Sequence, residues 1–205
     1  MKIFAIGMNY ALHNKELHGT LSKTAQPVIF LKPDTALLRP GKPFFVPSDM
    51  GRIDYETEVI VRFCKAGKSI DPQFAHRYYD AVSLGFDFTA RDMQAQMKQQ
   101  GRPWDIAKGF DQSAAIGEWI PKEQLPDIQD LHFSMQKNGD IVQSGHTADM
   151  LYSVADIIAY ISRFFTLHTG DILYTGTPAG VGPVEPGDVL KGFLEDKEIL
   201  SLQCK

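Results

Sequence analysis

Two glutamates, Glu56 and Glu58, stand immediately before the β-branched run 59–61. Residues i and i+2 of a β-strand project from the same face, so a strand here would direct both carboxylates into one space. An exposed acidic strand face would give the same spacing. The pair is therefore a candidate for metal binding, if another segment supplies a third carboxylate.

Asp87 is the candidate for that third carboxylate. It lies between two phenylalanines in the apolar stretch 82–88, which is typical of an interior strand. Burial of an ionised carboxylate is costly unless the group is paired or coordinated, and a cation shared with the two glutamates would offset the cost. Three carboxylates favour a hard ion such as Mg²⁺, with Mn²⁺ or Ca²⁺ as alternatives. The competing explanation is an ion pair between Asp87 and Arg91 or Lys108.

A histidine and a glutamate near the start of the chain form a second candidate pair. His13 and Glu16 are three residues apart, so they would meet on one face of a helical turn. A carboxylate that orients one imidazole nitrogen leaves the other free to accept a proton, which makes His13 a candidate general base. On a short helix, the same spacing is also typical of two unrelated surface residues.

Two lysines and a glycine-rich segment could contact an anionic substrate. Lys32 follows an apolar run and precedes a proline, so it can lie at a strand end, and Lys108 is expected in a glycine-containing loop. In the segment 174–183, Thr177 and nearby backbone N–H groups could form an oxyanion or carboxylate site. Solvated lysines and a tight turn are the alternatives. Neither a P-loop nor the GxGxxG pattern is present, which disfavours nucleotide binding.

Short β-rich stretches, separated by Gly, Pro, Asp and Asn, must position these side chains. Strands are predicted over residues 3–6, 28–31, 58–63, 81–88, 131–136, 172–175 and 189–194. The Asn-Gly dipeptide within 137–140 predicts a β-hairpin. Strands do not alternate regularly with helices, so the sequence favours an α+β, β-rich fold over a doubly wound parallel sheet.

Two helices are predicted. Residues 154–165 are apolar at helical spacing, and Ser153 and Asp156 supply a capping box at the start. A polar helix is predicted over about 90–100, ending near Gly101.

Length and composition predict one globular domain over residues 1–205, with 43% hydrophobic and 22% charged residues. The net charge of −4 comes from scattered residues without a basic stripe, which disfavours nucleic acid as a partner. Cys64 and Cys204 have neither metal-ligand spacing nor a disulfide framework, which favours a reducing compartment. The sequence has no apolar run of secretory or membrane-spanning length, so we expect a cytoplasmic protein without membrane association.

Six ordered segments resemble motifs of the fumarylacetoacetate hydrolase family. The resemblance is greatest to its short acylpyruvase and oxaloacetate decarboxylase members, and it runs from about Ile3 to the C-terminus. The segments are Gly7-Met-Asn-Tyr-x-x-His13-x-x-Glu16, Phe30-Leu-Lys-Pro33, Tyr55-Glu-x-Glu58, Phe88-Thr-Ala-Arg-Asp92 after Asp87, Lys108-Gly-Phe-Asp111 and Thr175-Gly-Thr-Pro-x-Gly-Val-Gly182.

The resemblance implies a mixed β-roll or sandwich of the family's catalytic-domain type, with short helices, and a homodimer. It also implies that the substrate is a small 2-oxo acid. By the same matching, the metal ligands fall on Glu56, Glu58 and Asp87, the water-activating pair falls on His13 and Glu16, a further catalytic group falls on Lys108, and substrate contacts fall on Lys32, Arg91, Gln94 and Thr177.

The expected reaction is Mg²⁺-dependent hydrolysis of the C–C bond of an acylpyruvate-type 2,4-dioxo acid, through a metal-stabilised pyruvate enolate. Oxaloacetate decarboxylation or tautomerisation and isomerisation of 2-hydroxyhepta-2,4-diene-1,7-dioate are the alternatives at the same site. A module that only binds metal or 2-oxo acids is the non-enzymatic alternative.

Two segments depart from the family pattern. Met8 stands where an Arg is frequent, and His146 and Ala148 stand where smaller or hydroxyl-bearing residues are common. Loss of a cation near the entrance could change the preferred substrate charge. Residues 14–26 are polar, and we expect them to form a lid that carries Glu16 over the site.

Overall fold

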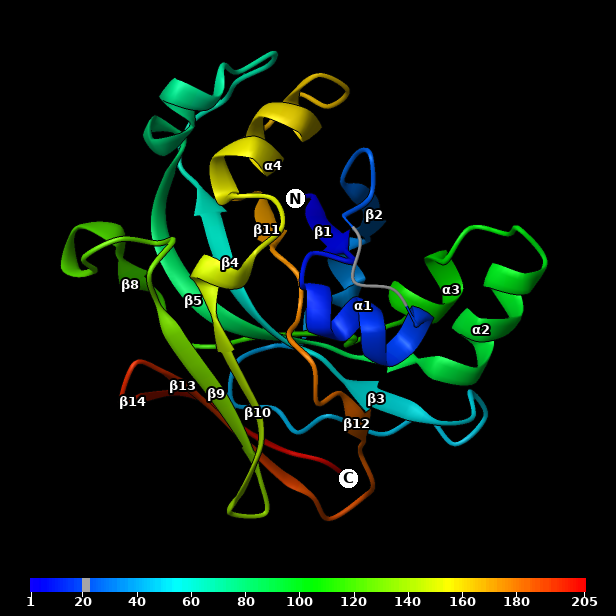
Figure 1. Ribbon diagram of the computed structural model, residues 1–205. Helices are drawn as coiled ribbons and strands as arrows, with labels where there is room; N and C mark the ends of the chain where they lie inside the picture. Colours follow the sequence, from blue (N-terminus) through cyan, green and yellow to red (C-terminus); the bar gives the residue numbers. More distant parts are fainter. Residues whose placement is uncertain (20–22) are drawn as a thin grey trace.

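The structure is a computed structural model that describes residues 1–19 and 23–205 (Figure 1). Its strands are β1 (Ile3–Gly7), β2 (Val28–Lys32), β3 (Ile53–Tyr55), β4 (Thr57–Phe63), β5 (Tyr79–Asp87), β6 (Thr89–Ala90), β7 (Ala114–Ile116), β8 (Ile120–Pro121), β9 (His132–Lys137), β10 (Asp140–His146), β11 (Ile172–Tyr174), β12 (Gly182–Pro183), β13 (Val189–Leu194) and β14 (Lys197–Gln203). Its α-helices are α1 (Ala11–His18), α2 (Arg91–Gln99), α3 (Asp105–Lys108) and α4 (Val154–Ser162). The 3₁₀ helices of the described residues are η1 (Asp34–Ala36), η2 (Pro72–Arg77), η3 (Lys122–Gln124) and η4 (Thr147–Asp149).

Three sheets make up most of the molecule. The largest has the order β2-β1-β11-β4-β5-β7, with β8 also paired to β5. A second sheet has the order β10-β9-β13-β14, and a small third one has the order β12-β3-β6. Among the described strands of the largest sheet, only β1 and β11 pair in parallel, so strands near the two ends of the chain meet at its centre. The β-rich α+β fold with short helices is confirmed.

The core follows from side-chain alternation along the central strands. In β4, Val59 and Val61 pack into one apolar cluster with the buried face of α4, whereas Ile60 belongs to a different cluster. Phe86 of β5 packs in a third cluster with Leu190 of the second sheet. The central strands are therefore covered on both faces, as expected for continuous apolar runs.

The helices occupy different sides of the sheets. In Figure 1, α4 lies above the long strands β4 and β5, whereas α2 and α3 lie together at the right, with α1 between these regions. The capping box predicted for α4 is present, since the Ser153 hydroxyl accepts from the Asp156 N–H at 3.1 Å. The polar helix α2 is confirmed.

Most local predictions are confirmed within one or two residues at each strand end. The β9–β10 hairpin turns at Asn138 and Gly139, both with positive φ. Two predictions were wrong in detail. The helix predicted over 154–165 ends at Ser162, and Lys108 lies in the single-turn helix α3 rather than in a loop.

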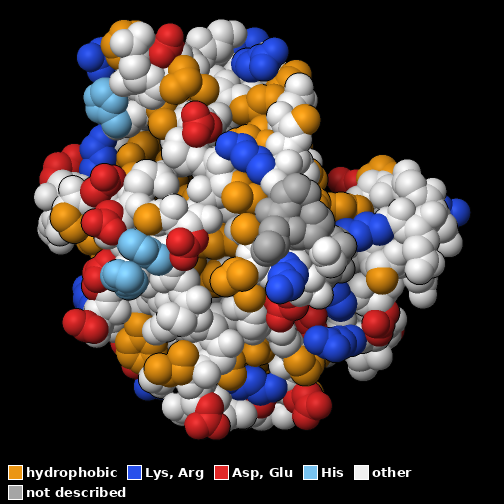
Figure 2. All heavy atoms as spheres, viewed as in Figure 1, with side chains coloured by type: hydrophobic (Ala, Val, Ile, Leu, Met, Phe, Trp, Pro, Cys, Tyr) orange, Lys and Arg blue, Asp and Glu red, His pale blue; other side chains and the backbone are white. Residues whose placement is uncertain are grey.

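The surface carries both charge signs. Among the described residues on the face seen in Figure 2, basic and acidic side chains are interspersed rather than gathered in one basic stripe. Within the described residues, none of the helices is long and apolar enough to cross a membrane. Both cysteines, Cys64 and Cys204, are free thiols.

Candidate metal and active site

The candidate site lies where the ends of four neighbouring strands of the largest sheet, β1, β11, β4 and β5, meet. β4 begins beside the end of β5, because Thr57 pairs with Phe86 in an antiparallel register. β11 ends against β4, where Tyr174 pairs with Ile60, and β1 ends beside β11 because these two strands are parallel. Residues that follow β1, β5 and β11 therefore meet the residues that begin β4.

The three predicted carboxylates converge at these strand ends. Glu56, Glu58 and Asp87 each offer a carboxylate oxygen, and these oxygens lie within 4.8 Å of one another. All three side chains are buried. Glu56 lies in the break between β3 and β4, and its carbonyl accepts from the Asp87 N–H at 2.8 Å. The predicted convergence of a strand pair with a buried aspartate is therefore present in the structure.

Lys108 links two of these carboxylates. Its Nζ donates to Glu56 Oε2 at 2.7 Å, to Asp87 Oδ2 at 2.8 Å and to Thr89 Oγ1 at 2.7 Å. These contacts come from the end of α3, and they account for the three N–H bonds of the ammonium group. The carboxylates raise the pKa of Lys108 despite its burial, which keeps it charged.

Arg91 is also held by protein acceptors. Its Nε donates to Asp54 Oδ2 at 2.8 Å, its Nη1 donates to Gln94 Oε1 at 2.9 Å, and its Nη2 donates to Glu56 Oε1 at 2.6 Å. Asp54 is in turn paired with Arg52 at 2.6 Å. Arg91 therefore orients Glu56, while Asp54 fixes the position of Arg91 itself.

Lys32 lies beneath the carboxylates rather than on the pocket wall. Its side chain is fully buried, and its Nζ lies 2.7 Å from Asp87 Oδ1. It also donates to Ser113 Oγ at 2.9 Å and to the Lys108 carbonyl. From this position Lys32 orients Asp87 and does not line the pocket bordered by Glu56 and Glu58, so its expected contact with a substrate stays a prediction.

The charge balance around the carboxylates fits a bound cation. Burial would raise the pKa of Glu56, but Lys108 and Arg91 outweigh burial and hold its pKa below the usual range. Burial, together with Asp87 and Glu56, raises the pKa of Glu58 well above its usual value. Glu58 accepts the Gly176 N–H at 2.6 Å, and within residues 1–19 and 23–205 it forms no ion pair. A divalent cation among three oxygen donors would satisfy this buried carboxylate.

His13 and Glu16 lie across the pocket from α2. The His13 Nδ1 is 3.5 Å from Glu16 Oε2, and Glu16 also accepts the Gly180 N–H at 3.2 Å. His13 is buried, and this burial lowers its pKa, so the imidazole is neutral near pH 7. With a proton on the nitrogen that faces Glu16, the other ring nitrogen can accept a proton. Residues 20–22 of the expected lid lie outside the described residues.

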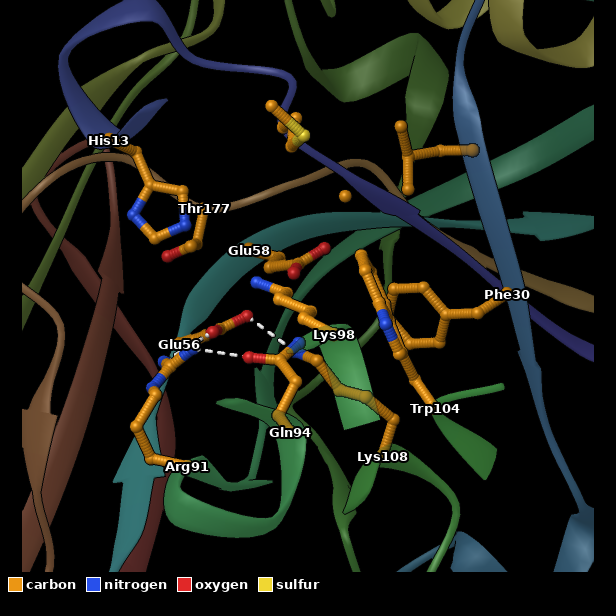
Figure 3. A pocket seen from close by; sticks show the side chains of 13 residues that line it. His13, Phe30, Glu56, Glu58, Arg91, Gln94, Lys98, Trp104, Lys108 and Thr177 are labelled. Atoms are coloured by element: carbon orange, nitrogen blue, oxygen red, sulfur yellow. Dashed lines mark hydrogen bonds and ion pairs between the residues drawn. The ribbon is translucent and has the colours of Figure 1, made fainter. Parts of the chain in front are cut away.

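The pocket above the carboxylates has two different walls. Figure 3 shows His13 and Thr177 on one side and Phe30 and Trp104 on the other, with the glutamates between them. Thr177 is fixed from behind, because its hydroxyl donates to the Thr57 carbonyl at 2.9 Å. Gln94 lines the pocket as well. The expected substrate positions at Arg91, Gln94 and Thr177 thus border one pocket.

Lys98 and Trp104 line the pocket, but the sequence analysis did not identify either as a site residue. Lys98 was detectable, because it follows Arg91 and Gln94 at spacings of seven and four residues on the predicted polar helix. Trp104 precedes α3, which the sequence did not predict, so no local pattern placed it.

Only one of the departures from the family pattern borders the pocket. Met8 lines the pocket, and its backbone has a positive φ of 64°. The Asn14 Nδ2 donates to the Met8 carbonyl at 3.0 Å, which helps to hold this backbone conformation. His146 instead stacks on His132 with ring centroids 4.1 Å apart, and it contacts Asp130 at 2.7 Å. The His146 departure therefore lies outside the pocket lining.

Comparisons of the sequence and of the structure with known proteins agree on one protein family. The family model for the fumarylacetoacetate (FAA) hydrolase C-terminal domain matches residues 2–203. A mitochondrial oxaloacetate tautomerase from Mus musculus is 38% identical over 203 residues, which cover 99% of this chain and 90% of the relative. A mitochondrial oxaloacetate decarboxylase from Dictyostelium discoideum is 39% identical over 191 residues, covering 93% and 87% of the two chains.

A solved structure gives the same result. The fumarylpyruvate hydrolase from Pseudomonas aeruginosa, in complex with Mn²⁺ and pyruvate, superposes with a TM-score of 0.93 at 34% identity. The match covers all of this chain and 89% of that structure. These relatives are enzymes with different reactions, so the comparison fixes the ancestry rather than the reaction. The chain belongs to the fumarylacetoacetate hydrolase family.

Proposed function

We propose that this protein is a divalent-metal-dependent enzyme that interconverts the enol and keto forms of oxaloacetate or a closely similar 2-oxo acid. The observation that carries the proposal is that a neutral, buried His13 lines the same pocket as Glu56 and Glu58, two members of the buried carboxylate triad. The Mus musculus relative, an oxaloacetate tautomerase over almost the full chain, supports this choice of reaction.

Glu56, Glu58 and Asp87 would hold the cation, and Mg²⁺ is the proposed ion because all three donors are carboxylate oxygens. When bound, such a cation withdraws electrons from a carbonyl group and makes the neighbouring C–H more acidic. Lys108 and Arg91 would keep Glu56 ionised, and Lys108 would orient both Glu56 and Asp87. The Mn²⁺ in the Pseudomonas aeruginosa structure supports the choice of a divalent ion.

His13 would perform the proton transfer. It accepts the proton that leaves the enol hydroxyl or the carbon beside the 2-oxo group, and it returns a proton to the other position, so atoms balance. Glu16 would stabilise the imidazolium that forms in between, because its carboxylate lies 3.5 Å from the imidazole Nδ1. Phe30 and Trp104 would limit the access of water to the substrate from the opposite side.

A second candidate is hydrolysis of the C–C bond of an acylpyruvate. The intact His13–Glu16 pair favours it, because an oriented imidazole can deprotonate water as well as a carbon acid. The Pseudomonas aeruginosa fumarylpyruvate hydrolase supports it too. Backbone N–H groups near Thr177 would then stabilise the oxyanion, because the Thr177 hydroxyl already donates to the Thr57 carbonyl.

The deciding experiment compares three reactions of the purified protein with Mg²⁺: oxaloacetate tautomerisation, oxaloacetate decarboxylation and acylpyruvate hydrolysis. We expect tautomerisation to be the fastest. The His13→Gln variant should lose about 100-fold or more in tautomerisation and hydrolysis, since both need a general base, but less in decarboxylation.

The matched control is His76→Gln, which changes an exposed histidine and should leave all three rates unchanged. Acylpyruvate hydrolysis faster than tautomerisation would replace the first candidate by the second. No turnover of any 2-oxo acid with Mg²⁺ or Mn²⁺ would contradict both.

A further inference from the structure

One cation of the pocket differs from the others in its partners. Lys32, Arg91 and Lys108 all donate to protein acceptors, including the carboxylates of the triad. Lys98 also lines the pocket, yet among the described residues no acceptor or carboxylate lies within bonding distance of its Nζ. Its charge is therefore available to a ligand.

Lys98 is held facing the pocket by its surroundings. It extends from α2, it is half-buried, and its Nζ lies 4.9 Å from the centre of the Trp104 ring, within the range of a cation–π contact. Burial and the nearby Arg91 and Lys108 charges lower the pKa of Lys98 to about 8, while Glu56 acts in the opposite direction. A partly desolvated ammonium group without a partner gains more from an incoming anion than an exposed one does.

The charges of the neighbouring groups indicate what that anion is. Lys32, Lys108 and Arg91 balance the three carboxylates of the triad, and Asp54 has Arg52 as a further partner. A divalent cation and Lys98 therefore leave the loaded pocket with an excess of positive charge. One carboxylate on the substrate offsets only part of this excess, whereas a second one offsets more.

We propose that Lys98 binds a second carboxylate at the far end of the substrate, and so selects dicarboxylic over monocarboxylic 2-oxo acids. This inference rests on the proposed function, in which the triad and its cation engage the first carboxylate and the 2-oxo group. Lys98 enters the pocket from the side of Trp104, whereas His13 lies on the other side of the glutamates (Figure 3). A substrate held at the triad would therefore have its far carboxylate within reach of Lys98 if it extends toward Trp104.

The test uses two unreactive ligands that differ at one end. 2-Oxoglutarate carries a distal carboxylate, and 2-oxovalerate has the same chain length with a methyl group there. Calorimetric titration into Mg²⁺-loaded protein measures Kd for each ligand. Lys98→Gln should weaken 2-oxoglutarate about tenfold and change 2-oxovalerate by less than about twofold, as expected for the loss of one charge pair.

Two further variants make the result specific. Lys98→Arg keeps the positive charge and should retain most of the preference for 2-oxoglutarate. Lys42→Gln removes an exposed lysine outside the pocket and should change neither Kd.

The outcomes separate this inference from the proposed function. Wild-type protein that binds both ligands, with equal changes or none in Lys98→Gln, overturns the role of Lys98 and leaves the metal-dependent site intact. Wild-type protein that binds neither ligand in the presence of Mg²⁺ overturns the proposed function and the inference together.

Discussion

At the scale of single residues, the site depends on charges that compensate one another. Lys108 bridges Glu56 and Asp87, so two of the proposed metal ligands are held in place by a protein cation. Glu58 has a backbone N–H as its partner instead. Because an uncompensated buried carboxylate destabilises the fold, Glu58 is the ligand at which a cation contributes most to stability.

Glu58→Gln tests this difference. The substitution removes one ligand and one buried charge, so the metal-free variant should be at least as stable as the wild type. The wild type should gain about 2.7 kcal/mol at a metal concentration of 100 times Kd, and the variant should lose most of this gain. Thermal unfolding with and without Mn²⁺ measures both effects. Glu123→Gln, at an exposed position, is the control, and full metal stabilisation in Glu58→Gln would argue against the triad.

Lys98 should give the binding of dicarboxylic acids a pH dependence. Its ammonium form binds the anion, and this form is present below the lowered pKa of about 8 and lost above it. Affinity for 2-oxoglutarate should therefore fall as pH rises through about 8, whereas affinity for 2-oxovalerate should not follow. Lys98→Arg stays charged throughout and should abolish the fall. Parallel profiles for the two ligands in the wild type would contradict the prediction.

At the scale of elements, the turn after β11 connects the proposed metal ligand Glu58 to the start of the chain. Gly176 has a φ of 102°, donates its N–H to Glu58 and packs tightly against Asn9. Asn9 holds the same turn by donating to the Thr175 carbonyl at 2.8 Å. A glycine is required here because a side chain would meet both backbone strain and a close neighbour.

Gly176→Ala should therefore lower stability by about 1–3 kcal/mol and weaken Mn²⁺ binding. The added Cβ would lie 2.7 Å from the Asn9 Cβ, which would displace the turn and its hydrogen bond to Glu58. Gly139→Ala is the matched control, because Gly139 has a similar φ of 96° but nothing within 4 Å of its Cβ position. Chemical denaturation measures both variants, and equal losses would show that strain alone matters at Gly176.

At the scale of the whole molecule, distant parts of the chain are interlocked. β1 pairs with β11 in the centre of the largest sheet, and the Phe44 N–H donates to the Gln203 carbonyl at 2.9 Å. The pocket likewise joins residues from Ile6 to Thr177. The sheet β10-β9-β13-β14 lies within the second half of the chain, but the largest sheet, the small third sheet and the pocket each combine residues from both halves.

We therefore predict that residues 1–205 unfold as one domain in a single cooperative transition. Urea unfolding followed by far-ultraviolet circular dichroism should coincide with unfolding followed by tryptophan fluorescence. Trp104 reports on the pocket and Trp119 on the region of β8. A fluorescence change that precedes the loss of secondary structure would indicate two units.

The sequence resemblance also implies a homodimer. Analytical ultracentrifugation of the folded protein, without urea, tests this expectation.

Local sequence determined the elements and the type of chemistry. Alternation and β-branched runs located the central strands, Asn-Gly located the β9–β10 hairpin, and a capping box located the start of α4. The spacing of Glu56 and Glu58, together with an aspartate inside an apolar strand, predicted three convergent carboxylates. These features are encoded by neighbouring residues, so a local pattern is enough to find them.

Tertiary structure decided what those patterns do together. The parallel pairing of β1 with β11, the burial of Lys32 beneath Asp87 and the position of Trp104 depend on segments far apart in sequence. The same is true of Lys98, whose role depends on the cations beside it already having partners. A charged residue's sequence neighbours do not reveal which acceptors reach it, because in a buried site those acceptors arrive from other strands and helices.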